Sequence, residues 1–329
     1  MNTIRFWLHN ARSIALPQSM LPAVVAVCIA SRFSGFSIYL SLPAVFGVAM
    51  AHLSLNLFDD YFDYKVKGAE FRDAMVRKGF RARIAKCHYL ISGEATLRQL
   101  LIACLVFGAI ACVAGSIIWW FRGNFILWIT LMAVLLGISY SGAPLRLSYH
   151  GLGEIVIGVM FGPLSMIGVY YAACGHFDGS IVFISIPVGL LVSNIVYTHA
   201  IMDYEPDKEV GKMTLAVLLK KQRRVLVCLL LLLLAAYGCI IGGVGSGYLS
   251  KYYLFTLLTL PLAVSLFYLM VEFVRHPDKK FSPRFWMGPM NDWKKIQAYQ
   301  LDWFMIRWLS ARNLLVFFCL ILIIVGFIV

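Results

Sequence analysis

Charged residues are scarce in this sequence. Only 14% of its 329 residues are charged and 61% are hydrophobic, a balance that excludes an ordinary soluble protein of this length. Most apolar residues fall in blocks of about 20, the length that an α-helix needs to cross roughly 30 Å of hydrocarbon. Barrel strands are about half that long. The composition therefore predicts an all-α, polytopic membrane protein, with a single domain over residues 1–329.

Three other features are missing. The eight cysteines show no Cys-x-x-Cys spacing, so neither a disulfide framework nor a zinc site is implied. No nucleic-acid-binding motif is present, and the basic loops are separated by apolar blocks, so nucleic acid is not an expected partner. A separate signal peptide is also not expected, because residues 1–14 are typical of a short amphipathic segment at the membrane interface.

Nine membrane spans are predicted, at residues 15–31, 38–58, 97–120, 124–141, 152–173, 180–201, 225–244, 252–273 and 313–329. The N-terminus and loops 59–96, 142–151, 202–224 and 274–312 then share one side. Twenty-six of the 29 Lys and Arg residues lie on that side or at its span ends. The positive-inside rule places it in the cytoplasm, as expected for a multi-pass protein of the cell (inner) membrane.

Two acidic runs on this side carry the strongest signal. One contains Asn56, Asp60 and Asp63, and the other contains Asp203 and Asp207. Residues spaced by three or four share a helix face, and the negative helix C-terminus disfavours carboxylates unless they hold something. Oxygen ligands at this spacing suit Mg²⁺, which binds through carboxylates and substrate phosphates. The runs therefore predict a metal site that holds a polyanion such as a diphosphate.

Several other residues are candidates for substrate binding. Lys212 lies beside the second run and is suited to pairing with phosphate oxygens. Arg72 in the first acidic loop is a weaker candidate, because a single loop arginine is explained by topology alone. Tyr140 and Arg146 flank a Gly-Pro turn and either meet substrate or serve as an interfacial Tyr and a topogenic Arg. His199 precedes Asp203 by one helical turn, where it supports the acidic site or simply packs.

The loop 274–312 is basic and aromatic. Trp, Lys and Arg together suit the lipid headgroup layer. A helix on the membrane surface is therefore favoured over a lid for substrate. The residues behind this prediction are Lys279, Lys280, Arg284, Trp286, Trp293, Lys294, Lys295, Trp303, Arg307 and Trp308.

Together these motifs resemble the UbiA superfamily of intramembrane aromatic prenyltransferases. The resemblance runs from Ala11-Arg12 to Thr214-Leu215 and is strongest at 56–65, at 140–144 with 149–154, and at 203–215. Within the superfamily, the Asn-Leu-x-x-Asp-Tyr-x-Asp spacing, the Gly-Leu-Gly-Glu turn and the Gly-Lys-x-Thr-Leu ending are similar to those of 1,4-dihydroxy-2-naphthoate polyprenyltransferases. The chain departs from the pattern at Asp59, where relatives often have Asn, at His199-Ala200, where they often have Asn, and at Arg146, near where some carry Lys.

The resemblance implies nine helices around a central cavity, with Mg²⁺ held through Asn56, Asp60, Asp63, Asp203 and Asp207. It implies polyprenyl transfer from a polyprenyl diphosphate to 1,4-dihydroxy-2-naphthoate, with loss of CO₂ and diphosphate, to give demethylmenaquinone. Asp60, Asp203 and Lys212 are then the expected catalytic residues. Two alternatives remain. One is another aromatic acceptor such as 4-hydroxybenzoate. The other is a membrane transporter with paired carboxylates, although its carboxylates would be expected deeper inside the spans.

Overall fold

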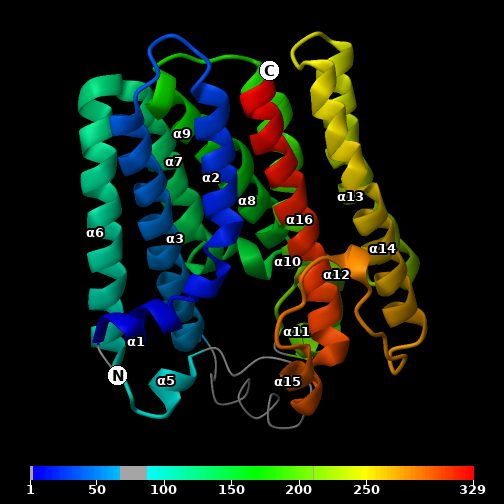
Figure 1. Cartoon of the computed structure of the whole chain (residues 1–329). Coiled ribbons are helices and arrows are strands. Elements are labelled where there is room, and N and C mark those ends of the chain that lie inside the picture. The colour runs from blue at the N-terminus through cyan, green and yellow to red at the C-terminus, as the bar shows by residue number, and fades with distance from the viewer. Residues whose placement is uncertain (1–2, 67–86, 210) are drawn as a thin grey trace.

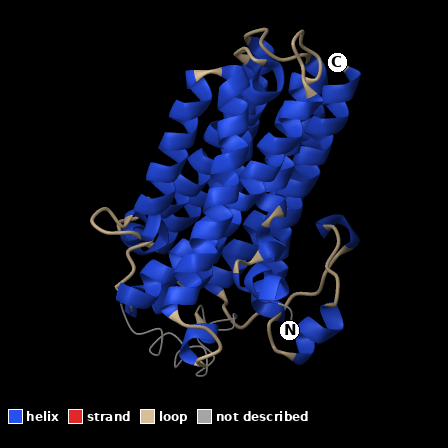
Figure 2. Ribbon diagram, turned by 90° about the vertical axis from the view of Figure 1, so that its left-hand side faces the viewer, coloured by secondary structure: helices blue, strands red, loops and turns tan. Residues whose placement is uncertain are grey.

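The computed structural model describes residues 3–66, 87–209 and 211–329. These residues form helices joined by turns and loops, with no β-strand among them (Figure 2). In this part of the chain nine helical segments are long and apolar enough to cross a membrane, which confirms the predicted all-α, polytopic architecture. The segments are Ser13–Ala30, Ile38–Lys65, Leu97–Arg122, Asn124–Ser141, Gly153–Cys174, Ser180–Met202, Gln222–Gly245, Lys251–Arg275 and Asp302–Ile328.

The long helices pack into a bundle (Figure 1). Helix α3 (Ile38–Val66) packs along α6 (Leu97–Arg122), and α2 (Pro17–Ala30) packs against α9 (Ser165–Cys174) and α16 (Asp302–Ile328). Helix α10 (Ser180–Met202) contacts α8 (Gly153–Val159), α13 (Gln222–Gly245) and α16. Most of its residues are buried, so α10 forms the centre of its part of the bundle.

Two glycines allow α10 to approach the α8–α9 segment closely. A Cβ on Gly162 would lie 2.5 Å from the Cα of Gly189, closer than side-chain carbons approach in proteins. Gly162 belongs to a π-helical turn, Met160–Leu164, that joins α8 to α9. Small residues at such crossings let helix backbones pack in a membrane, where no hydrophobic effect drives association. The crossing fixes α10 relative to the loop before α8.

Two predicted span ends are wrong. The second helix continues through Val66 instead of ending at residue 58, so the first acidic run lies on helix rather than in a loop. The last helix begins at Asp302 instead of residue 313. Arg307, expected in the headgroup layer, is therefore fully buried inside α16. It donates there to the carbonyls of Leu269, at 3.1 Å, and Trp303, and it lies 4.8 Å from the Phe273 ring, while its Nη2 has no hydrogen-bond partner among the described residues.

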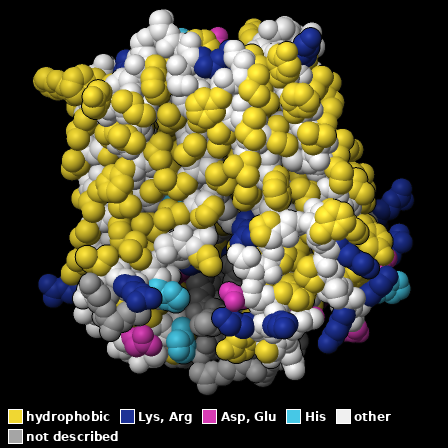
Figure 3. Space-filling model, viewed as in Figure 1, with side chains coloured by type: hydrophobic (Ala, Val, Ile, Leu, Met, Phe, Trp, Pro, Cys, Tyr) yellow, Lys and Arg dark blue, Asp and Glu magenta, His cyan; other side chains and the backbone are white. Residues whose placement is uncertain are grey.

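The acidic runs lie at one end of the bundle. The ends of α3 and α10 that carry the runs both lie there, and α1 (Thr3–Asn10), which lies across the long helices, and α5 (His88–Ile91) pack beside the end of α3 (Figure 1). The space-filling view is hollowed at this end, between the helices on the α3 side and those on the α16 side (Figure 3). The basic side chains of this face also gather mostly near this end (Figure 3).

Candidate active site

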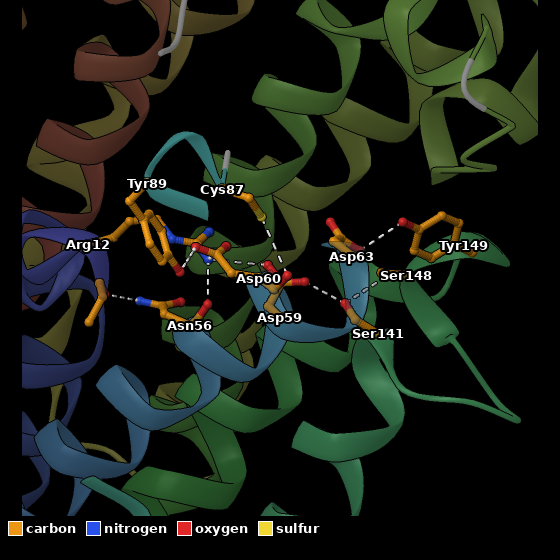
Figure 4. Close-up of polar contacts among 11 residues, drawn as sticks. Arg12, Asn56, Asp59, Asp60, Asp63, Cys87, Tyr89, Ser141, Ser148 and Tyr149 are labelled. Atoms are coloured by element: carbon orange, nitrogen blue, oxygen red, sulfur yellow. Dashed lines mark hydrogen bonds and ion pairs between the residues drawn. The ribbon is translucent and has the colours of Figure 1, made fainter. Parts of the chain in front are cut away.

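The last three turns of α3 present the first acidic run on one side of the helix, as the spacing of Asn56, Asp60 and Asp63 predicts (Figure 4). Asp60 and Asp63 are each only 3% exposed. Buried carboxylates need partners. The partners within the described residues come from four segments, namely the N-terminal turn, α5, the end of α7 (Asn124–Ser141) and the loop after it.

Among the described residues, Arg12 is a cation bound to this run, and no role was predicted for it from the sequence. Its Nη2 donates to Asp60 Oδ1 at 2.7 Å, to Asp59 Oδ2 at 3.4 Å and to the carbonyl of Asn56 at 2.6 Å. The amide of Asn56 in turn donates to the carbonyl of Ala11 at 2.9 Å. The Ala11–Arg12 turn and α3 therefore hold each other, in a contact we call the Arg12 clasp.

The clasp has a backbone cost and an electrostatic benefit. Arg12 has φ 58° and ψ 45°, a left-handed conformation that residues other than glycine adopt only when their surroundings impose it. Burial disfavours its charge, but the carboxylates of Asp60 and Asp59 outweigh that effect and raise the pKa of Arg12. Arg12 is therefore a permanent positive charge at the acidic run. The available sequence signal was an arginine just before the first predicted span, at the start of the stretch that carries the family resemblance.

Helix α5 and the residue before it also contact Asp60. The Tyr89 hydroxyl donates to Asp60 Oδ2 at 3.1 Å, and the Cys87 thiol donates to the Asp60 carbonyl at 3.4 Å. Burial, together with the neighbouring Asp60 carboxylate, raises the pKa of Tyr89. Tyr89 therefore stays a neutral hydrogen-bond donor, and Asp60 has a donor on each of its two oxygens.

The other two acids of the run connect α3 to the loop that follows α7. The Ser141 hydroxyl, at the end of α7, donates to Asp59 Oδ1 at 2.5 Å. The Tyr149 hydroxyl donates to Asp63 Oδ1 at 2.8 Å. Tyr149 lies in a 3₁₀ turn, Leu147–Tyr149, within a motif that carried the family resemblance, but no role was predicted for it.

The second acidic run forms at the end of α10. His199 Nε2 lies 3.0 Å from Asp203 Oδ2, one turn later. Asp203 and Asp207 are 7% and 4% exposed. Backbone hydrogen bonds connect Asp207 to the carbonyl of Asp203, and Lys212 to the carbonyl of Asp207, both at 2.8 Å. These bonds fix the run as one compact turn, with α11 (Tyr204–Glu209) inside it.

Tyr149 brings the two runs together. While its hydroxyl binds Asp63, its ring lies 5.9 Å from the Lys212 ammonium, within reach of a cation–π contact. Glu154, buried at the start of α8, accepts a hydrogen bond from the Leu215 amide at 3.2 Å. A short parallel bridge also pairs His150 with Met213. The loop before α8 and the loop after α10 therefore form one unit that faces the end of α3.

The remaining predicted substrate-binding residues fall in different places. Arg146 adopts a left-handed turn with φ 42°, and its Nε is buried without a hydrogen-bond partner in the described part of the chain. Tyr140 is partly buried and packs against the apolar cluster of Val156, Met160 and Leu164. Arg72 lies outside the described residues.

The predicted metal ligands supply suitable chemistry. Asn56, Asp60, Asp63, Asp203 and Asp207 offer only oxygen donors, which Mg²⁺ prefers. Among the described residues, no group of three acidic, His or Cys side chains is close enough to hold an ion by itself. Mg²⁺ commonly binds through one or two carboxylates and completes its shell with water and substrate phosphates. The donor set therefore fits an ion that arrives with a diphosphate.

Comparison with known protein families shows the family to which this chain belongs. The model of the UbiA prenyltransferase family matches residues 19–291, a stretch that contains both acidic runs and the loop between α7 and α8. The chain belongs to this family.

Named relatives match this chain over about two thirds of its length or more. A 1,4-dihydroxy-2-naphthoate octaprenyltransferase from Bacillus subtilis is 26% identical over 77% of this chain and 78% of its own length. A 2-carboxy-1,4-naphthoquinone phytyltransferase from Synechocystis is also 26% identical, over 66% of this chain and 67% of its own.

Solved structures share the fold at lower identity. A digeranylgeranylglyceryl phosphate synthase is 17% identical, covers 100% of both chains and gives a TM-score of 0.65. A UbiA homolog from Archaeoglobus fulgidus, bound to GPP and Mg²⁺, is 17% identical over 96% of this chain and 99% of its own, with a TM-score of 0.59. These similarities confirm the predicted UbiA-type helical fold.

Proposed function

We propose that this protein transfers a polyprenyl group from a polyprenyl diphosphate to 1,4-dihydroxy-2-naphthoate. The observation that carries the proposal is the joining of the two acidic runs through Tyr149, with Lys212 beside them, in a family whose named relatives include naphthoate prenyltransferases. The carboxylate end of the bundle is proposed to face the cytoplasm, from the inner membrane of the cell, because 26 basic residues gather on that side.

The reaction breaks the bond between the first prenyl carbon and the diphosphate oxygen. A new carbon–carbon bond forms to the naphthoate ring, the carboxylate leaves as CO₂, and the electron pair of the broken bond leaves with the diphosphate. The organic product is demethylmenaquinone in its reduced, quinol form. No external oxidant is needed for these steps.

Cations of this chain would hold the leaving group. Neither Lys212 nor Arg146 forms an ion pair with a described residue, so both have charge to offer a diphosphate. Mg²⁺ bound through Asn56, Asp60, Asp63, Asp203 and Asp207 would supply further neutralisation of the phosphate oxygens. The Arg12 clasp and Tyr89 hold Asp60 in place, so that little reorganisation is required when negative charge develops.

An acceptor panel tests the proposal. Purified protein is given Mg²⁺ and a polyprenyl diphosphate with either 1,4-dihydroxy-2-naphthoate or 4-hydroxybenzoate, and pyrophosphate and the prenylated product are quantified by mass spectrometry. We expect a decarboxylated, prenylated product from the naphthoate. A product from 4-hydroxybenzoate alone would overturn the acceptor. The transporter alternative would be supported by solute flux in proteoliposomes without product from any acceptor.

A further inference from the structure

A groove between α13 and α14 (Leu260–Arg275) lies apart from the carboxylate site. Its volume is about 350 Å³, and the two helices form the edge of the bundle (Figure 1). Its lining residues are Gln222, Arg223, Leu226, Val227 and Leu230 of α13, with Phe267, Val274 and Arg275 of α14. The groove is therefore open to whatever surrounds the bundle at that edge.

The lining changes character along the groove. Arg223 lies in the first turn of α13, and Arg275 is the last residue of α14. The two helices run in opposite directions, so both arginines mark the same end of the groove, the end on the side of the acidic runs. Leu230 and Phe267 lie about two turns further along their helices, roughly 10–12 Å deeper into the spans. The groove thus has a cationic mouth and an apolar interior.

The positive charge is dense at the cationic mouth of the groove. Four of the five residues at 220–224 are basic, and none is acidic. The nearest acid along α14, Glu272, is bound by Lys279 at 2.5 Å. Arg223 and Arg275 form no ion pair with any residue that the structure describes. Two guanidinium groups at one opening are therefore left without an ion-pair partner among the described residues.

The position of the groove in the membrane indicates a ligand that matches both its cationic mouth and its apolar interior. Both helices are membrane spans that end at this mouth, so the arginines reach the headgroup layer while the groove faces acyl chains. Guanidinium groups bind phosphate through paired hydrogen bonds, and basic pockets between spans attract anionic headgroups. We propose that this groove binds an anionic phospholipid, with its phosphate at Arg223 and Arg275 and one acyl chain along Leu226, Leu230 and Phe267.

The alternative explanation is that these arginines only set the topology of the protein in the membrane. Arg224 distinguishes this explanation from a specific lipid site. Arg224 is exposed and adjacent to Arg223 but does not line the groove. Topogenic or non-specific attraction treats the two residues alike, because both place one charge at the same depth. Lipid binding at a specific site in the groove requires Arg223 and Arg275 and does not require Arg224.

Native mass spectrometry of the whole protein tests the site, with phosphatidylglycerol or phosphatidylcholine as the probe. We expect phosphatidylglycerol to bind in preference to phosphatidylcholine. Affinity should fall roughly five-fold in Arg223→Gln and in Arg275→Gln, and about thirty-fold in the double variant. Arg224→Gln should bind as the wild type does, and Leu230→Trp, which fills the groove, should weaken binding with every arginine present.

Three outcomes would overturn the proposal. The first is equal binding of the two phospholipids. The second is an equal effect of Arg224→Gln and Arg223→Gln, which would make the attraction non-specific. The third is displacement of bound phosphatidylglycerol by geranyl diphosphate at equal concentration, which would assign the groove to the prenyl substrate. Thermal unfolding of each variant, measured alongside, confirms that altered binding occurs in folded protein.

Discussion

Arg12 offers the sharpest test of how the first acidic run is held. Replacing it with Ala removes the donor to Asp60 Oδ1 at 2.7 Å, the donor to the Asn56 carbonyl at 2.6 Å and the longer contact to Asp59. Breaking a buried ion pair by deleting one partner costs about 3–5 kcal/mol. The Arg12 side chain is 32% exposed and that of Asp60 only 4%, so the low end, about 3 kcal/mol, is expected.

A second variant separates the contribution of the Arg12 charge to stability from that of its backbone conformation. Arg12→Gly also removes the guanidinium, but glycine adopts the left-handed conformation at φ 58° without the penalty of about 1–2 kcal/mol that Ala incurs. The greater freedom of glycine in the unfolded chain returns roughly 0.4–1 kcal/mol of that advantage. Arg12→Gly should therefore be about 0.5–1 kcal/mol more stable than Arg12→Ala.

Both differences in the free energy of unfolding are measured by unfolding the protein in mixed micelles with increasing SDS, with circular dichroism as the signal. Arg12→Lys is the matched control, because it retains the charge but loses the planar fork that contacts several oxygens together, and it should fall between wild type and Arg12→Ala. An Arg12→Ala protein within about 0.5 kcal/mol of wild type would refute the clasp, since surface substitutions change stability by that much. A Gly variant less stable than the Ala variant would refute the assigned backbone conformation.

Three further predictions concern packing around the site. Tyr149→Phe removes the hydroxyl that binds Asp63 but retains the ring near Lys212, so we expect a loss of about 1 kcal/mol in the same unfolding assay and lower pyrophosphate release, with Tyr149→Ala more severe. Gly162→Ala places a methyl group against α10 and should cost about 1–3 kcal/mol, whereas Gly238→Ala, which meets nothing within 4 Å, should be neutral or stabilising. Equal effects of the two glycine variants would contradict the close helix crossing. Glu154→Ala frees the Leu215 amide and should raise KM for the diphosphate substrate through the Lys212 loop; an unchanged KM would count against that connection.

The nine membrane-length helical segments of the described residues were predictable because each span leaves an apolar block of membrane length. The shared face of Asn56, Asp60 and Asp63 was also predictable, since α3 simply continues through them. The start of α16 was not. Arg307 interrupts an apolar pattern, and only the fold shows that the carbonyl of Leu269, 38 residues away, accepts a hydrogen bond from this buried guanidinium alongside the carbonyl of Trp303.

The hydrogen-bond partners of the carboxylates could not be predicted from the sequence, for a related reason. Arg12 and Asp60 are 48 residues apart, and Tyr149 and Asp63 are 86 apart. Helical periodicity reports which residues share a face but not which distant segment covers that face. The family resemblance included Tyr149 within a motif, yet only the fold shows that its hydroxyl and ring connect the two acidic runs.

The central claim is that the two acidic runs together form the site of prenyl transfer. Its most direct test is pyrophosphate release by Asp203→Asn, with Mg²⁺, 1,4-dihydroxy-2-naphthoate and a polyprenyl diphosphate. Asp292→Asn is the matched control, because Asp292 is exposed at the same end and its left-handed backbone also suits Asn. We expect Asp203→Asn, like Asp60→Asn, to lose at least about 100-fold in rate, with Asp292→Asn unchanged. Full activity in both Asp60→Asn and Asp203→Asn would contradict the account.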